Sequence, residues 1–125
     1  MHSRLIVLVI DDDCGFLELV NYNLKLDGFS TINATNGYDG IKLAKSKKPD
    51  VILLDTTMPG IDGLETLAEL KNDKKTENIP VIMLTAKAHM EDIDRAFRVG
   101  ADGYITKPVD MDKLGMIVNQ KLSKA

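Results

Sequence analysis

Several polar side chains that can take part in chemistry stand directly after short apolar runs of the sequence. They are Asp11, Asp12, Asp13, Asp55, Thr85 and Lys107. Each could have an ordinary structural role on its own, such as a helix cap, the end of a strand or a solvated amine. Core packing requires none of them, however, and the same placement recurs along the chain. We therefore treat them as parts of one candidate site.

Grouped carboxylates favour a divalent cation. Two ionised carboxylates about 4 Å apart repel each other by roughly 4 kcal/mol at an effective dielectric constant of about 20. Oxygen ligands without a nearby His or Cys favour Mg²⁺, with Mn²⁺ as the alternative, over zinc. Such a site suggests phosphoryl chemistry, in which Asp55 is the best nucleophile because a carboxylate can accept a phosphoryl group directly. Lys107 would neutralise the charge of the transferred group, and Thr85 would hydrogen-bond one of its oxygens.

The apolar runs themselves are typical of strands in a parallel sheet. The runs that end at Ile10, Leu54 and Leu84 are short and rich in Val, Ile and Leu, as central strands buried on both faces are. Phe29 to Ala34 mixes polar and apolar residues, and Tyr104-Ile105 is very brief. These two segments are therefore predicted to be edge strands.

A helical pattern follows every predicted strand. The expected helices are marked by Leu17, Val20 and Leu24 before Gly28; by Ile41 and Ala44 within 38–46; by Leu64, Leu67 and Leu70 after a capping box of Asp62 and Glu65; by Ile93, Ala96 and Phe97 before Gly100; and by Leu114, Ile117, Val118 and Leu122 after Asp110. The segment from Lys71 to Lys75 is predicted to be a solvated helix end.

Strict alternation of strands and helices predicts an α/β fold, a doubly wound five-stranded parallel sheet with helices on both faces. With the second and fifth strands at the edges, the simplest strand order is 2-1-3-4-5, which is the flavodoxin-like order. In open sheets of this kind the ligand crevice lies outside the carboxyl ends of the strands, where the order reverses. The candidate site residues are expected to meet there.

Length and composition exclude several other classes of protein. A chain of 125 residues with 44% hydrophobic and 28% charged residues is predicted to be one globular domain, residues 1–125. A net charge of -3 argues against direct nucleic-acid binding. The apolar runs are too short for a signal peptide or a membrane span, so a cytoplasmic protein is expected. The single cysteine, Cys14, is expected to be a small reduced apolar filler.

Four motifs resemble the receiver domain of two-component response regulators, the family of the bacterial chemotaxis regulator. They are V-I-D-D-D at 9–13, L-L-D-T-T-M-P-G-I-D-G at 53–63, L-T-A at 84–86 and G-A-D-G-Y-I-T-K-P at 100–108. Each motif is weak alone, but four of them in the right order at predicted strand ends are specific. The resemblance extends from Leu5 to about Leu122, so a single receiver domain is expected.

The resemblance implies that Asp55 is phosphorylated by a sensor histidine kinase or a histidine phosphotransfer protein. The domain would then be a phospho-accepting signalling domain rather than an enzyme, since it would catalyse only its own phosphorylation and dephosphorylation. By the same resemblance, Asp11, Asp12, Asp55 and the backbone carbonyl of Thr57 would hold Mg²⁺. Asp13 is expected to be a helix cap or to lie outside the ligand set.

The resemblance also implies a signalling switch. Thr85 and Lys107 would contact the phosphoryl group. When the Thr85 hydroxyl moves toward that group, Tyr104 would swing inward. This movement would reshape a surface that meets a downstream target or an output domain. Thr57 and Lys87 would flank the water that attacks the phosphoryl group. The Lys107-Pro108 bond is expected to be cis, and Met58-Pro59-Gly60 and Gly63 are expected to shape the loop after Asp55.

Other classes share part of the pattern. A haloacid-dehalogenase-type phosphatase would use Asp11 as its nucleophile, but Gly15 stands where that family has Thr or Val, and 125 residues leave little room for a cap. A flavodoxin-like electron carrier would need a loop rich in Ser, Thr and Gly in place of three aspartates. The intact set of acids, Thr85 and Lys107 disfavours a degenerate receiver that only binds. Whether the domain acts alone or within a longer product stays open.

Overall fold

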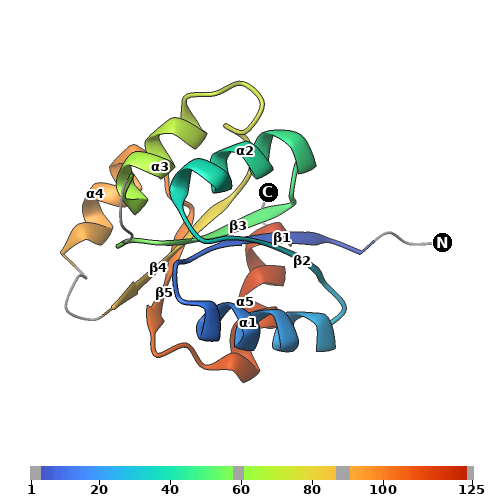
Figure 1. Cartoon of the computed structure of the whole chain (residues 1–125). Helices are drawn as coiled ribbons and strands as arrows, with labels where there is room; N and C mark the ends of the chain where they lie inside the picture. The colour runs from blue at the N-terminus through green and yellow to red at the C-terminus, as the bar shows by residue number, and fades with distance from the viewer. Residues whose placement is uncertain (1–3, 58–60, 87–90, 124–125) are drawn as a thin grey trace.

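One parallel sheet forms the centre of the computed structural model, which describes residues 4–57, 61–86 and 91–123. Its strands are β1 (Ile6–Ile10), β2 (Ser30–Ala34), β3 (Val51–Asp55), β4 (Val81–Ala86) and β5 (Gly103–Lys107). They pair in the order β2-β1-β3-β4-β5, with β2 and β5 at the edges (Figure 1). The predicted fold, strand order and edge strands are confirmed.

Helices cover both faces of the sheet. They are α1 (Cys14–Leu26), α2 (Gly37–Lys47), α3 (Gly63–Lys71), α4 (Asp92–Val99) and α5 (Met111–Ser123). In Figure 1, α2, α3 and α4 lie above the sheet, and α1 and α5 lie below it. Every segment predicted to be helical therefore contains a helix, and each joins two strands or ends the alternating series.

The central strands are buried on both faces because their side chains alternate between two apolar layers. In β1, Leu8 and Ile10 pack into the layer under α2, α3 and α4, whereas Val7 and Val9 pack into the layer under α1 and α5. These four side chains are fully buried. The continuous apolar runs of the sequence thus reflect a sheet that has no solvated face.

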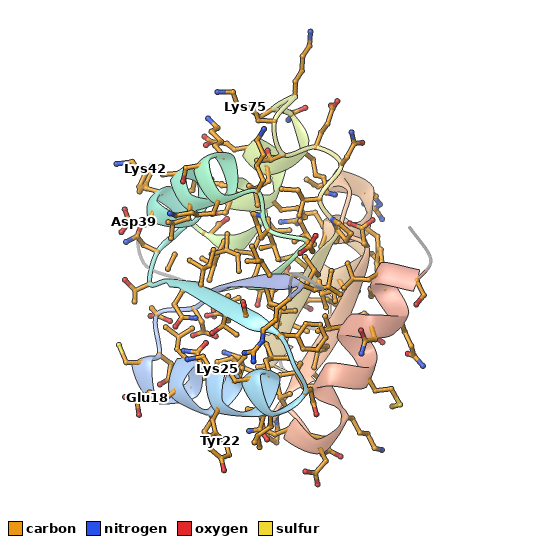
Figure 2. The ribbon with its side chains drawn as sticks, turned by 90° about the vertical axis from the view of Figure 1, so that its right-hand side faces the viewer. Glu18, Tyr22, Lys25, Asp39, Lys42 and Lys75 are labelled. Atoms are coloured by element: carbon orange, nitrogen blue, oxygen red, sulfur yellow. The ribbon has the colours of Figure 1, made fainter. Side chains whose placement is uncertain are left out.

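Polar side chains start the helices and cover their outer faces. Asp13, Asn36 and Asp62 each accept a hydrogen bond from the backbone N–H three residues later, at the starts of α1, α2 and α3. Figure 2 shows the outer sides of α1 and α2, where Tyr22 points away from the sheet and Lys42 reaches into solvent. The predicted cap at Asp62 is confirmed.

Two expectations about apolar packing were wrong. Cys14 is exposed, because the first residue of α1 follows directly after the cap and faces solvent. Phe97 does not fill the core under α4, since it is 45% exposed and its ring packs edge-to-face against Tyr104. Of the apolar stripe Ile93, Ala96 and Phe97, α4 buries only Ile93 and Ala96, so its buried face is narrower than the stripe.

Lys71 departs from the expectation of a solvated helix end. Its amine donates hydrogen bonds to the backbone carbonyls of Glu77 and Ile79 and forms an ion pair with Asp102 at 3.0 Å. The Asp102 carboxylate also accepts from the N–H of Val81, so Lys71 helps tie the end of α3 to the entry of β4. Lys71 has this structural role at the end of the sheet opposite the carboxyl ends of the strands.

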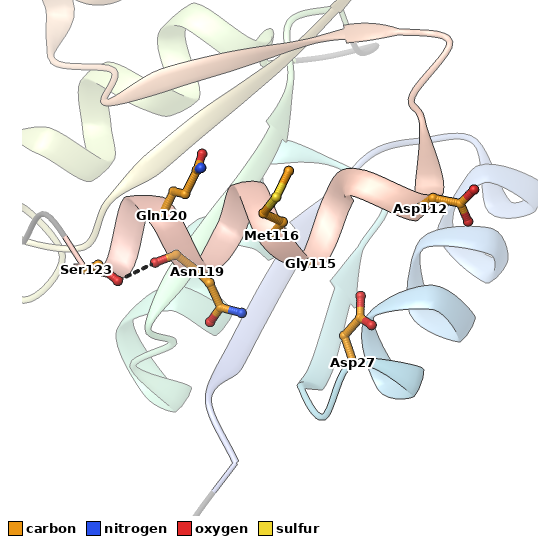
Figure 3. A pocket seen from close by; sticks show the side chains of 7 residues that line it. All are labelled: Asp27, Asp112, Gly115, Met116, Asn119, Gln120 and Ser123. Carbon is orange, nitrogen blue, oxygen red and sulfur yellow. Dashed lines mark hydrogen bonds between the residues drawn. The ribbon is translucent and has the colours of Figure 1, made fainter.

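A groove of about 710 Å³ lies between the end of α1 and the outer side of α5 (Figure 3). Asp27 and Gly115 line it and approach each other so closely that a Cβ at Gly115 would collide with the Asp27 carboxylate. None of the candidate site residues lines this groove. Within the described part of the chain, no helix is long and apolar enough to cross a bilayer.

Candidate functional site

Three carboxylates meet at the carboxyl ends of β1 and β3, which are neighbours in the sheet. Asp11 and Asp12 follow β1, Asp55 ends β3, and one oxygen of each lies within 4.8 Å of the others. Asp11 and Asp55 are buried, whereas Asp12 is exposed. The structure thus brings together three of the four acids that the sequence singled out, the three expected to hold the cation, with Asp12 open to solvent at the rim.

Lys107 reaches these carboxylates from the end of the edge strand β5. Its Nζ lies 2.8 Å from Asp11 Oδ2 and 3.7 Å from Asp55 Oδ1. Burial acts to lower the pKa of Lys107, but the hydrogen bond to Asp11 and the charges of Asp55 and Asp11 outweigh it and raise the pKa above its usual 10.5. Lys107 is therefore a fixed positive charge in the site at neutral pH.

Asp55 is the acid whose charge the site disfavours. Burial raises the pKa of Asp55 from 3.8 to about 6, and the negative charge of Asp11 adds to the rise. The charge of Lys107 and a hydrogen bond from the N–H of Thr57, 3.4 Å from Asp55 Oδ1, act in the opposite direction. Among residues 4–57, 61–86 and 91–123, Lys107 is the lysine that pairs with these acids. One lysine does not neutralise three neighbouring carboxylates, so the site has room for further positive charge.

These donors fit a hard divalent cation. The cluster offers only carboxylate oxygens, which Mg²⁺ prefers, and its open side at Asp12 leaves space for the water and phosphate ligands that Mg²⁺ usually keeps. A bound cation would also offset the repulsion between Asp11 and Asp55.

Asp13 stands beside the carboxylate cluster and has a structural role. Its N–H donates to Asp11 Oδ1 at 3.0 Å, and its own carboxylate accepts from the N–H of Phe16 at 3.1 Å. The expectation of a helix cap is confirmed. The same turn places the ring of Phe16 with its centroid 4.5 Å from the Nζ of Lys107. The sequence-based prediction did not include Phe16.

The loop after β3 passes close to the site. A Cβ at Gly63 would lie 2.7 Å from the Cα of Thr56 and would collide with the carbonyl oxygen of Asp55. Only glycine therefore allows α3 to start against the end of β3. Residues 58–60, which were also expected to shape this loop, and Lys87 lie outside the described residues.

Thr85 and Tyr104 lie on the neighbouring strands β4 and β5. Thr85 is fully buried, and its hydroxyl donates to the carbonyl of Ala86 at 3.2 Å rather than to a site carboxylate. Tyr104 is 43% exposed and meets Phe97 edge-to-face at 6.3 Å. The Lys107-Pro108 bond is cis, as expected. In this structure Tyr104 is thus in an outward position.

A sheet of this order, with acids and a lysine at its carboxyl ends, defines the response regulator receiver class. The family model of the response regulator receiver domain matches residues 7–119, and the chain belongs to this family. It is a signalling domain of the two-component type, and domains of this family bind Mg²⁺ through acidic residues.

Individual relatives include both short and long proteins. Protein PilH of Pseudomonas aeruginosa is 38% identical over 117 residues, which are 94% of this chain and 97% of PilH. The DNA-binding dual master transcriptional regulator RpaA of Synechocystis is 40% identical over 108 residues, which are 86% of this chain but only 45% of RpaA. The chain therefore spans less than half the length of some curated relatives and almost all of another.

Solved structures agree with this placement. A CheY-like response regulator receiver domain protein from Methanospirillum hungatei has a TM-score of 0.90 and 27% identity, with 98% of this chain and 96% of that chain covered. The chemotaxis response regulator CheY4 of Vibrio cholerae has a TM-score of 0.88 and 25% identity, with 95% of this chain and 99% of that chain covered.

Proposed function

We propose that this domain accepts a phosphoryl group on Asp55, in a Mg²⁺-dependent reaction, from a sensor histidine kinase or a histidine phosphotransfer protein. The observation that carries the proposal is the position of Asp55, a buried carboxylate with a raised pKa that lies within 4.8 Å of two other acids and 3.7 Å from the amine of Lys107. A structural ion pair would need only one acid, whereas phosphoryl transfer needs a nucleophile and several positive charges around it.

The reaction transfers the phosphoryl group between two side chains. The P–N bond of the donor phosphohistidine breaks, a P–O bond to an Asp55 oxygen forms, and the imidazole keeps the electron pair of the broken bond and takes up a proton from solvent. Lys107 supplies positive charge toward the phosphoryl oxygens from 3.7 Å on one side of Asp55. We assign the hydroxyl of Thr85 to a further phosphoryl oxygen.

Asp11, Asp12, Asp55 and the backbone carbonyl of Thr57 would hold Mg²⁺, with Mn²⁺ as a substitute. When bound, the cation supplies charge neutralisation for the acids and for the incoming phosphoryl oxygens. Two contacts of Asp11 support a holding role for it rather than a nucleophilic one. Lys107 engages its Oδ2 at 2.8 Å and the N–H of Asp13 engages its Oδ1 at 3.0 Å. Each of these oxygens keeps a further lone pair for a cation. The contacts of Asp55 are longer, at 3.4 Å and 3.7 Å, so Asp55 is the more available nucleophile, which disfavours a phosphatase that uses Asp11.

Phosphorylation changes a protein-interaction surface in this proposal. Thr85 and Tyr104 form the switch: the hydroxyl of Thr85 turns toward the phosphoryl group, and Tyr104 leaves its outward position to fill the space behind it. The downstream partner is a target protein or an output domain. We propose that residues 1–125 are one receiver domain, located in the cytoplasm, that does not itself bind nucleic acid or membranes.

Incubation with acetyl phosphate and Mg²⁺, followed by intact-mass measurement, tests the proposal. We expect one phosphoryl addition to the wild type, no addition in Asp55→Asn or in EDTA, and normal addition in the control Asp39→Asn, whose side chain is exposed on α2. Undiminished addition in Asp55→Asn would refute the assignment. Steady turnover of small phosphate esters, without a stable protein adduct, would favour the phosphatase instead.

A further inference from the structure

The aromatic ring of Phe16 lies against the amine of Lys107. Phe16 belongs to the first turn of α1, and its ring centroid is 4.5 Å from the Nζ of Lys107, which ends β5. Phe16 is half-buried and packs against the apolar layer under α1 and α5. An ammonium within about 6 Å of a ring centroid is attracted by the negative face of the ring. The pair is therefore an interaction between two side chains that are far apart in the sequence.

A closed series of contacts holds this pair beside the carboxylates. The N–H of Asp13 donates to Asp11 Oδ1, and the N–H of Phe16 donates to the carboxylate of Asp13. The ring of Phe16 then touches the amine of Lys107, which returns to Asp11 through its 2.8 Å ion pair. The cap that starts α1 therefore fixes the position of the ring relative to the same carboxylate that binds the lysine.

Lysine needs such a restraint in this site. Its four-carbon stem is flexible, and its ammonium carries three donors that can turn in several directions. The side chain of Lys107 keeps 27% of its surface exposed, and its distance of 3.7 Å from Asp55 is longer than a hydrogen bond. Asp11 therefore holds the amine through one of its three donors. The ring of Phe16 contacts the same nitrogen from another direction and restrains it further.

We infer that Phe16 is a positioning residue, whose ring keeps the ammonium of Lys107 beside Asp55 and ready to meet the incoming phosphoryl group. This inference rests on the proposed function of Asp55. A purely structural role for Phe16 differs in one respect: any apolar side chain of similar size would then serve, because packing against the core does not require a ring. Only an aromatic side chain gives the attraction to the ammonium.

Four variants separate these roles. Phe16→Leu and Phe16→Met keep an apolar side chain without a ring, Phe16→Tyr keeps the ring, and Tyr22→Leu is a matched loss of a ring from an exposed position on the same helix. The first readout is the NMR shift of the Lys107 side-chain protons, which a nearby ring moves by its ring current. The second is the rate of phosphorylation by acetyl phosphate, and the third is Mg²⁺ affinity.

We expect Phe16→Leu and Phe16→Met to abolish the ring-current shift and to slow phosphorylation by about two- to tenfold, the range that a cation–π contact supports. Mg²⁺ affinity should change less than about twofold. Phe16→Tyr should restore both the shift and the rate, and Tyr22→Leu should alter neither.

Three results would overturn the inference. Lys107 proton shifts that are the same with and without the ring would show that the contact does not exist in solution. An unchanged phosphorylation rate in Phe16→Leu, despite the loss of the ring-current shift, would leave Phe16 a packing residue. Ring-current shifts in a wild type that gains no phosphoryl group would refute the function proposed for Asp55, and the positioning role with it, while leaving the contact itself intact.

Discussion

Replacing Asp55 by asparagine should make the metal-free protein more stable at neutral pH. The folded state raises the pKa of Asp55 from 3.8 to about 6, mainly by burial and then by the charge of Asp11. Between these two pH values the folded state binds a proton more strongly than the unfolded state. The stability of the wild type therefore falls as the pH rises from about 4 to about 6, and the loss is complete above that range.

The magnitude follows from the two pKa values. Each pH unit between them corresponds to about 1.4 kcal/mol, so ionisation of Asp55 in the folded state costs up to about 3 kcal/mol at pH 7.5. An asparagine side chain at this position would carry no charge and would have nearly the same volume. After allowance for imperfect hydrogen bonding of the amide, we expect Asp55→Asn to gain about 1–3 kcal/mol at pH 7.5 and less than about 1 kcal/mol at pH 4.

Urea unfolding in EDTA at the two pH values measures this difference. A gain of about 2 kcal/mol raises the urea midpoint by about 1 M if the slope is about 2 kcal/mol per M. Asp39→Asn, an exposed change in the first turn of α2, should instead leave stability unchanged or lower it slightly at both pH values. An Asp55→Asn variant that is less stable than the wild type, or equally stabilised at pH 4 and pH 7.5, would refute the electrostatic account of the site.

Other predictions address the cation, the phosphorylated state and the switch. Asp12→Ala should weaken Mg²⁺ binding at least tenfold in a titration, because it removes one of three carboxylate ligands, whereas Asp39→Ala should bind as the wild type does; equal affinities would mean that the cation lies elsewhere. Substitution of Thr57, which is exposed two residues past the phosphorylation site, should change the lifetime of the phosphorylated protein severalfold with little change in Mg²⁺ affinity, and a large loss of metal binding would contradict its assignment. Thr85→Ala should still be phosphorylated, though more slowly, and should lose most of the phosphorylation-dependent NMR shift around Tyr104; shifts as large as in the wild type would exclude the relay through its hydroxyl.

The sequence predicted the sheet well because the central strands are buried on both faces. A run such as Val51 to Leu54 has no polar member, and in a short segment of a globular chain that pattern is typical of a strand covered on both sides. Once the strand order was inferred, topology alone placed Asp11, Asp55 and Lys107 at the same edge of the sheet, and the structure brings these three together. Local rules also succeeded at Asp13, where an acid before a helix is its cap.

Contacts between distant segments were harder to predict. Lys71 looks like any surface lysine in the sequence, and only the folded chain shows that its amine meets carbonyls of a loop and the carboxylate of Asp102. Phe16 was missed for a similar reason, since an aromatic residue in the first turn of an amphipathic helix is usually interpreted as core. Its contact with Lys107 depends on how α1 and β5 are placed in three dimensions. The sequence did offer one signal: Phe16 stands three residues after the capping Asp13, which places it beside the acids that follow β1.

The central claim is that one particular carboxylate, Asp55, forms the bond to phosphorus. After phosphorylation with acetyl phosphate and Mg²⁺, reduction with borohydride converts an acyl phosphate on aspartate into homoserine, which peptide mass spectrometry assigns to a position in the chain. Our account predicts homoserine at position 55 alone, with Asp11, Asp12 and Asp13 unmodified. Homoserine at position 11, or at no aspartate of a protein that has gained the phosphoryl mass, would contradict it.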